Sequence, residues 1–143
     1  MNTQTYRHRF SVILNYLGII LMLIIFYLVK LQVLKAAFLL LEILPLFIII
    51  FSFRNAFIKT GIWKMTHAPG KQLDEREMQV ILHATNISYS LFAIVVLIVI
   101  YLFLLCGFGQ IDAVLAISIL YIAHILPASI LLWNERNHSR DKE

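Results

Sequence analysis

Charged residues are scarce in this sequence, and cysteine is almost absent. Of the 143 residues, 14% are charged and 61% are hydrophobic, whereas soluble domains are about a quarter charged. This shortage of charge excludes an ordinary soluble domain and indicates a membrane protein. Cys106 is the single cysteine, which excludes a disulfide within the chain and a cysteine metal cluster. We expect Cys106 to be a small, buried apolar residue.

Four apolar runs make up most of the chain. Each is close to the ~20 residues that cross ~30 Å of hydrocarbon as a helix, and none shows the apolar/polar alternation of a transmembrane β-barrel. We therefore predict an all-α membrane protein with four transmembrane helices, at residues 10–29, 33–53, 87–106 and 113–133. The first run follows the basic segment YRHR, but it is too long for a signal peptide and lacks a small-residue cleavage site, so we expect it to be retained.

Lysine and arginine are distributed unequally along the chain. Two lie in the N-terminal tail, five between the second and third predicted helices, and three in the C-terminal tail, whereas the other two connections hold Lys30 and Lys35 alone. Cytoplasmic segments carry the excess of basic residues, so we predict that both termini are cytoplasmic. A dual-topology protein would need a near balance. The residues on the predicted cytoplasmic side are Arg7, Arg9, Arg54, Lys59, Lys64, Lys71, Arg76, Arg136, Arg140 and Lys142.

Two short connections and one long segment join the predicted helices. Residues 30–35 and 107–112 are short enough to make two antiparallel hairpins, and Gly107 suits the left-handed conformation that ends many helices. The long segment, residues 54–73, contains FIKTGIWKM, which mixes apolar residues with lysine. This segment is either an interfacial segment in the lipid headgroup region or an ordinary loop with a few apolar anchors.

The segment LDEREMQ, from residue 73 to 79, marks the start of the third helix. Asp74 is suited to cap the helix, and Glu77 is placed to complete a capping box. We therefore predict a cytoplasmic extension of this helix that begins near Glu75. Asp74, Glu75, Arg76 and Glu77 are also a candidate contact for a cytoplasmic partner.

Residues 73–105 resemble a motif of small bacterial inner-membrane proteins of uncharacterised function. Those proteins carry an Asp-Glu-Arg sequence just before a transmembrane helix, as LDEREMQVILHATNISYS does here. The resemblance implies a location in the bacterial cytoplasmic (inner) membrane. It implies no activity.

Two parts of the sequence are nearly the same. EILPLFIIIFSFRN, at residues 42–55, aligns with HILPASILLWNERN, at residues 124–137, under a shift of 82 positions. Proline, arginine and asparagine are scarce in this sequence, so the alignment of these three residue types is the main evidence for the match. The match indicates a duplicated hairpin, which would be a parallel internal repeat. The alternative is convergence, because a proline-kinked helix that ends in arginine at the cytoplasmic face is a common arrangement in unrelated membrane helices.

The repeat places Glu42 and His124 at matching positions near the bilayer centre, where charged side chains are costly. Each precedes a proline by three residues, so we expect helix kinks at Pro45 and Pro127 that free backbone carbonyls for other partners. Three interpretations stay open for this candidate intramembrane polar pair. It is a hydrogen-bonded contact between helices, with Asn15 as another possible partner of Glu42; or it is a proton or cation site; or it faces a partner protein.

No arrangement typical of an enzyme is visible in the sequence. It has no nucleophile with an adjacent base and no phosphate-binding glycine loop. Two ligands do not make a zinc site, and His83 and His124 are expected at different depths, which argues against haem. We therefore predict no enzyme, no cofactor and no metal. His8, His67 and His138 are expected to be solvated.

Two classes of function remain. The first is a small structural, regulatory or accessory membrane subunit. The alternative is a small proton-coupled transporter or channel that uses Glu42 and His124. The expected partners are the lipid bilayer and a second copy or a larger membrane protein; nucleic acid is not expected, because no soluble domain presents a basic face.

Overall fold

A computed structural model describes residues 3–67, 73–107 and 110–134. These residues form helices and short connections, with no strand among them. Four of the helices are long and apolar enough to cross a membrane, which confirms the predicted all-α class and the number of such helices. They span Thr3–Lys30, Ala36–Ile58, Glu75–Cys106 and Ala113–Asn134.

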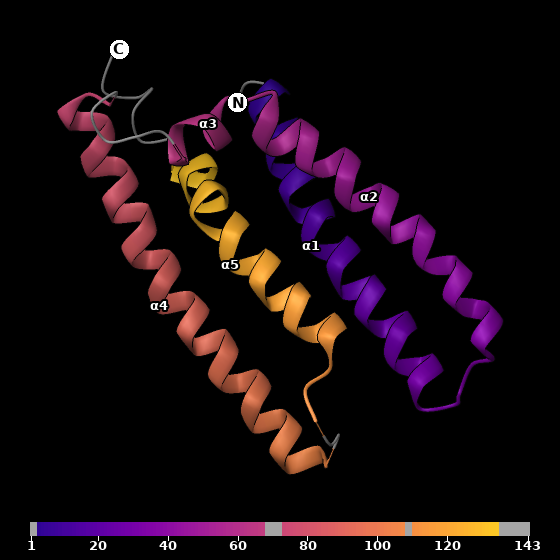
Figure 1. The fold of residues 1–143 in the computed structure, drawn as a ribbon. Coiled ribbons are helices and arrows are strands. Elements are labelled where there is room, and N and C mark those ends of the chain that lie inside the picture. Colours follow the sequence, from indigo (N-terminus) through magenta and orange to yellow (C-terminus); the bar gives the residue numbers. More distant parts are fainter. Residues whose placement is uncertain (1–2, 68–72, 108–109, 135–143) are drawn as a thin grey trace. The chain divides into compact units, whose positions relative to one another are not determined.

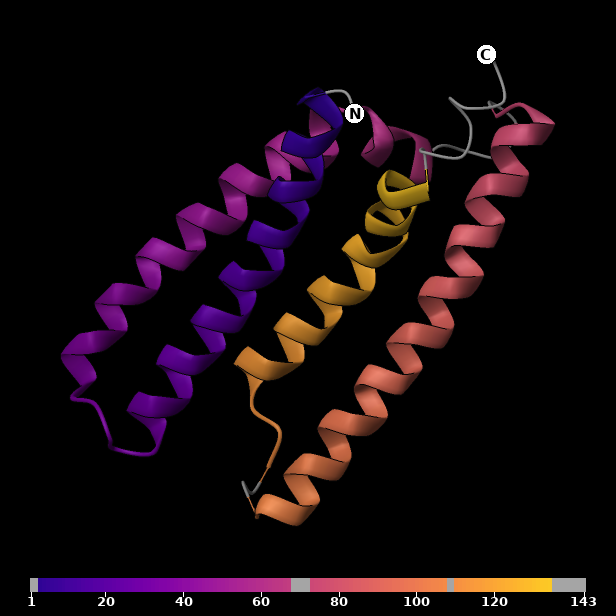
Figure 2. The ribbon, with the colours of Figure 1, turned by 180° about the vertical axis from the view of Figure 1, so that it is seen from behind.

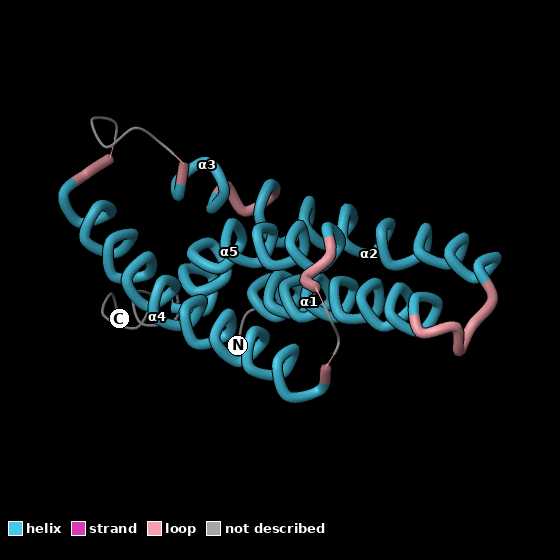
Figure 3. The backbone as a smooth tube through the Cα atoms, turned by 60° about the horizontal axis from the view of Figure 1, so that its bottom comes forward, coloured by secondary structure: helices cyan, strands magenta, loops and turns pink. Residues whose placement is uncertain are grey.

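The chain divides into two compact units, Met1–Gly61 and Ile62–Glu143. In the first unit, α1 (Thr3–Lys30) and the helix at Ala36–Ile58 lie side by side (Figures 1 and 2). A short loop joins them (Figure 3). In this loop Gln32 adopts a φ of 58°, in the left-handed region. The second helix begins at Ala36, three residues after the start of the predicted span at residue 33.

The helix at Ala36–Ile58 changes its geometry twice. It begins as the 3₁₀-helix η1 (Ala36–Glu42), continues as α2 (Ile43–Phe53) and ends as the π-helix η2 (Arg54–Ile58). Pro45 lies in the first turn of α2, where its missing N–H is tolerated. The helix continues five residues beyond the predicted span, which ends at residue 53, because the π-turn extends it past the apolar run.

The second unit contains the short helix α3 (Ile62–Thr66), the long helix α4 (Glu75–Cys106) and α5 (Ala113–Asn134). Helices α4 and α5 lie side by side in both views of the ribbon (Figures 1 and 2), and α3 also contacts α5. The predicted helix from residue 75 to 106 is confirmed at both ends.

Local sequence explains the helix ends of the second unit. Asp74 and Glu77 form the predicted capping box, and Gly107 ends α4 with a φ of 63°. At the start of α5, Asp112 Oδ1 accepts a hydrogen bond from the Leu115 N–H at 2.9 Å, a cap that we did not predict. Cys106 is exposed at the end of α4. The expectation that this cysteine is buried is therefore wrong.

Candidate functional site

Glu42 lies at the junction between η1 and α2. Its side chain is half-buried, and its Oε1 atom is buried without a hydrogen-bond partner in the structure. The carboxylate does not cap α2 either. At about 2.0 Å per residue in a 3₁₀-helix, Glu42 is about 12 Å from the Ala36 end; Arg54 is about 18 Å away in the other direction. A buried, unpartnered carboxyl oxygen inside an apolar helix costs free energy, typically about 1–3 kcal/mol.

A different polar group joins α1 to α2. The Asn15 side chain is fully buried, and its Nδ2 donates hydrogen bonds to the Ile49 carbonyl at 3.0 Å and to Ser52 Oγ at 2.9 Å. Ser52, also fully buried, donates to the same Ile49 carbonyl at 3.0 Å. The structure therefore gives Asn15 partners in α2 that lie seven or more residues beyond Glu42.

His8 is tied to the π-helix. Its Nδ1 atom lies 3.0 Å from the Asn55 carbonyl oxygen, and because a carbonyl can only accept, Nδ1 carries the proton. The His8 side chain is half-buried. The expectation that His8 is a solvated side chain is therefore wrong.

His124 lies midway along α5, and aromatic rings from the chain around α3 contact it. The Trp63 and His67 ring centroids lie 5.4 Å and 5.1 Å, respectively, from that of His124. Trp63 also stacks on His67, with ring centroids 4.1 Å apart and planes inclined by 29°. We call these three residues the His–Trp cluster. His67 and His124 are both exposed, as expected for His67, but each has ring contacts that the sequence did not predict.

A hydrogen bond orients His67 within this cluster. His67 Nδ1 lies 2.9 Å from the Trp63 carbonyl oxygen and 3.0 Å from Thr66 Oγ1. The carbonyl requires a donor, so the proton is on Nδ1 and the lone pair is on Nε2.

Pro127 lies inside α5 without ending it. Two residues further along, Ser129 Oγ donates to the Ile125 carbonyl at 2.9 Å. The carbonyl that Pro127 cannot bond is that of Ala123, immediately before His124.

Glu42 belongs to the first unit and His124 to the second. A contact between them stays a prediction. The match between residues 42–55 and 124–137 extends past Asn134, so Arg136 and Asn137 lie outside the described residues, as do Lys71, His138, Arg140 and Lys142.

The candidate partner contact is a solvent-facing helix start. Asp74 Oδ1 accepts from the Glu75 N–H at 2.7 Å, and Glu77 Oε2 accepts from the Asp74 N–H at 3.3 Å. Asp74, Glu75, Arg76 and Glu77 are all exposed. The helix start thus uses Asp74 and Glu77 for capping and leaves Glu75 on the surface.

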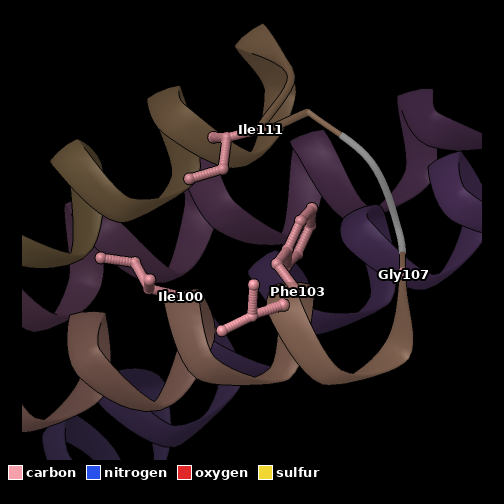
Figure 4. Close-up of a pocket in the computed structure, with 5 residues that line it drawn as sticks. Ile100, Phe103, Gly107 and Ile111 are labelled. Atoms are coloured by element: carbon pink, nitrogen blue, oxygen red, sulfur yellow. The ribbon is translucent and has the colours of Figure 1, made fainter.

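An open, apolar hollow of about 450 Å³ lies near the end of α4 (Figure 4). Its lining consists of Ile100, Phe103, Leu104, Gly107 and Ile111. None of these side chains can donate or accept a proton, so the hollow offers no acid–base chemistry.

No family model, curated protein or solved structure matches the chain. The described residues hold no group of three or more histidine, cysteine, aspartate or glutamate side chains that could bind a metal ion.

Sequence reasoning missed the Asn15–Ser52 contact, the His8–Asn55 contact and the His–Trp cluster. The spacing of Trp63 and His67, four residues apart, was the one local signal for the cluster, because such residues share a helix face.

Proposed function

We propose that this chain is a multi-pass protein of the bacterial cytoplasmic membrane, with two helical hairpins and both termini in the cytoplasm. In this proposal it acts as a small structural, regulatory or accessory subunit of a membrane assembly. The unequal distribution of lysine and arginine supports the orientation.

The exposure of α4 carries the proposal. In the most apolar 18-residue window of α4, none of the residues is buried within the structure, whereas 39% of the corresponding window of α5 is buried. Helix α4 therefore offers its apolar surface to lipid or to another transmembrane helix. Leu97 and Leu104, which are 66% and 75% exposed, lie on this surface.

Photo-crosslinking in native membranes tests this proposal. A photoreactive residue at Leu97 or Leu104 should give a protein adduct of one defined mass. This adduct is either a dimer of this chain or a complex of this chain with one partner protein in a fixed stoichiometry. The matched control is the fully buried Ile125 of α5, which should give no such adduct. Lipid adducts alone at both α4 positions would contradict the role as a subunit.

Orientation is tested separately by labelling of single cysteines in a Cys106→Ser background. A cysteine at Thr66 should react with an impermeant reagent only from the cytoplasmic side, and one at Gln110 only from the opposite side. Labelling of both positions from the same side would contradict the proposed topology.

A second candidate function is proton-coupled transport through Glu42 and His124. The buried Oε1 of Glu42, which has no hydrogen-bond partner in the structure, favours it, because ionisable groups within membrane helices often mark proton pathways. The test is acidification of vesicles that contain the purified protein under an imposed potential. Proton flux that Glu42→Gln abolishes would support transport, and flux equal to that of protein-free vesicles would exclude it.

A further inference from the structure

We propose that His67 and His124 bind a divalent transition-metal ion between their imidazole rings, with Cu²⁺ bound most tightly. The first argument is distance. Their ring centroids lie 5.1 Å apart. With metal–nitrogen bonds of about 2.0–2.1 Å, two imidazoles that both point at one metal at this separation subtend an angle of about 105°. This angle lies between the square-planar and tetrahedral values, so the separation suits two adjacent ligands of one ion.

The second argument is the protonation of His67. Histidine ligands usually donate their other ring N–H to a carbonyl or carboxylate, which fixes the ring and leaves the second nitrogen for the metal. His67 Nδ1 has this arrangement with the Trp63 carbonyl, at 2.9 Å. Its Nε2 is therefore available as a ligand.

The third argument concerns His124. Its ring contacts are the Trp63 and His67 rings, and among the described residues the structure gives it no hydrogen-bond partner. The χ2 torsion of histidine is broad, so rotation about it changes the direction in which the ring nitrogens of His124 point. The ring is exposed, and the adjacent His67 belongs to the segment predicted on the cytoplasmic side, from which an ion can reach the pair.

The two-histidine donor set determines the class of metal. Imidazole suits copper, nickel and zinc, and affinity for such ligands rises to Cu²⁺ in the divalent series. The described residues offer no third histidine, cysteine or carboxylate at this position, so water or another ligand would complete the coordination. We therefore expect exchangeable binding in the micromolar range. The bound ion would link α3 to α5, which are far apart in the sequence.

The position of Trp63 supplies a direct probe. Its ring stacks on His67 at 4.1 Å, so a paramagnetic ion held by His67 and His124 should quench its fluorescence. A Trp133→Phe protein keeps Trp63 as its single tryptophan, and a Trp63→Phe protein keeps Trp133. Both are purified with a tag that contains no histidine, and each is titrated with Cu²⁺ and Ni²⁺ alone.

We expect saturable quenching of Trp63 at micromolar Cu²⁺, reversal by a chelator, and at least a tenfold weaker response of Trp133. In the Trp133→Phe background, His67→Ala and His124→Ala should each weaken binding at least tenfold, and His83→Ala, at an exposed histidine of α4, should leave it unchanged. Equal quenching in all three variants, or no saturation up to millimolar metal, would overturn the proposal.

A second measurement needs no variant. The electron paramagnetic resonance spectrum of the Cu²⁺-loaded protein should show hyperfine coupling to two imidazole nitrogens. One nitrogen or none would overturn the proposal, even if a histidine variant failed to fold.

Discussion

Gly18 of α1 lies so close to Ile49 of α2 that a Cβ atom on residue 18 would stand 2.8 Å from Ile49 Cγ1. The same Cβ would lie 3.4 Å from the Pro45 carbonyl oxygen. The two helices therefore approach at a position that only glycine fills without displacement. Small residues have this role in membrane helices, because they allow close backbone approach. The contact lies one turn from the Asn15–Ser52 hydrogen bond, so close packing and polar bonding coincide.

The first prediction concerns this close approach. Gly18→Val should lower the free energy of unfolding in mixed detergent by about 1–3 kcal/mol, because overpacking forces Ile49 and the backbone near Pro45 to move. Gly18→Ala should cost less, since Ile49 Cγ1 belongs to a side chain that can rotate. The control is Leu17→Val, at a 54% exposed neighbour. Equal losses for Leu17→Val and Gly18→Val would show that α1 and α2 do not meet at Gly18.

The second prediction concerns the buried amide. Asn15→Ala should destabilise the protein more than Ser52→Ala. The first change removes the hydrogen bonds from Asn15 to both the Ile49 carbonyl and Ser52, whereas the second leaves the bond from Asn15 to the Ile49 carbonyl in place. Hydrogen bonds between membrane helices average about 0.6 kcal/mol, with a maximum of about 1.7. A double-mutant cycle should give a coupling energy in this range.

The control for this cycle is Gln4→Ala. Gln4 is exposed and lies about 16 Å from Asn15 along α1. It should not couple to Asn15→Ala. A zero coupling between Asn15 and Ser52 would contradict the hydrogen bond between them.

The third prediction concerns the start of α4. Asp74→Ala should cost about 1 kcal/mol of stability, since it removes the capping oxygen from the free N–H groups. Asp74→Asn should be tolerated, because asparagine caps equally well. The matched control is Glu75→Ala, which removes a carboxylate from the same turn without removing either capping bond.

Hydrogen exchange at residues 76–80 measures this effect locally. Faster exchange in Asp74→Ala, with Asp74→Asn unchanged, would support the cap. The same change in Glu75→Ala would point to the helix dipole, which also favours acidic residues at this end.

Features that depend on neighbouring residues could be predicted from the sequence, whereas features that depend on packing between distant residues could not. The start of α4 depends on residues within four positions of Asp74, and it was predicted correctly. The extension of the second helix through Ile58 and the contact of His8 with Asn55 depend on packing between residues far apart in the chain, and both were missed. Likewise, Trp63 and His67 come together with His124 only through the packing of α3 on α5. The Glu42–His124 pair rests on the repeat, and it stays a prediction.

The last prediction distinguishes the two proposed functions by a double-mutant cycle of Glu42→Gln and His124→Ala. The accessory-subunit proposal predicts effects on stability that are additive within about 0.3–0.5 kcal/mol where the residues do not touch, or a coupling that stays the same with pH where they form only a hydrogen-bonded contact. A proton relay predicts a larger coupling that differs between pH 5.5 and pH 8, the range in which histidine changes its charge.

A matched cycle of Trp63→Ala and His124→Ala shows that the method can detect a contact of His124. These rings lie 5.4 Å apart, and aromatic pairs contribute about 0.5–1.5 kcal/mol beyond the burial of area. One outcome is coupling between Trp63 and His124 together with additivity between Glu42 and His124. It would show that His124 contacts α3 and does not contact Glu42, whose partner would then lie in another protein. Coupling in both cycles, with a pH dependence for Glu42 alone, would instead favour the relay, since a proton can be shared only by groups that touch.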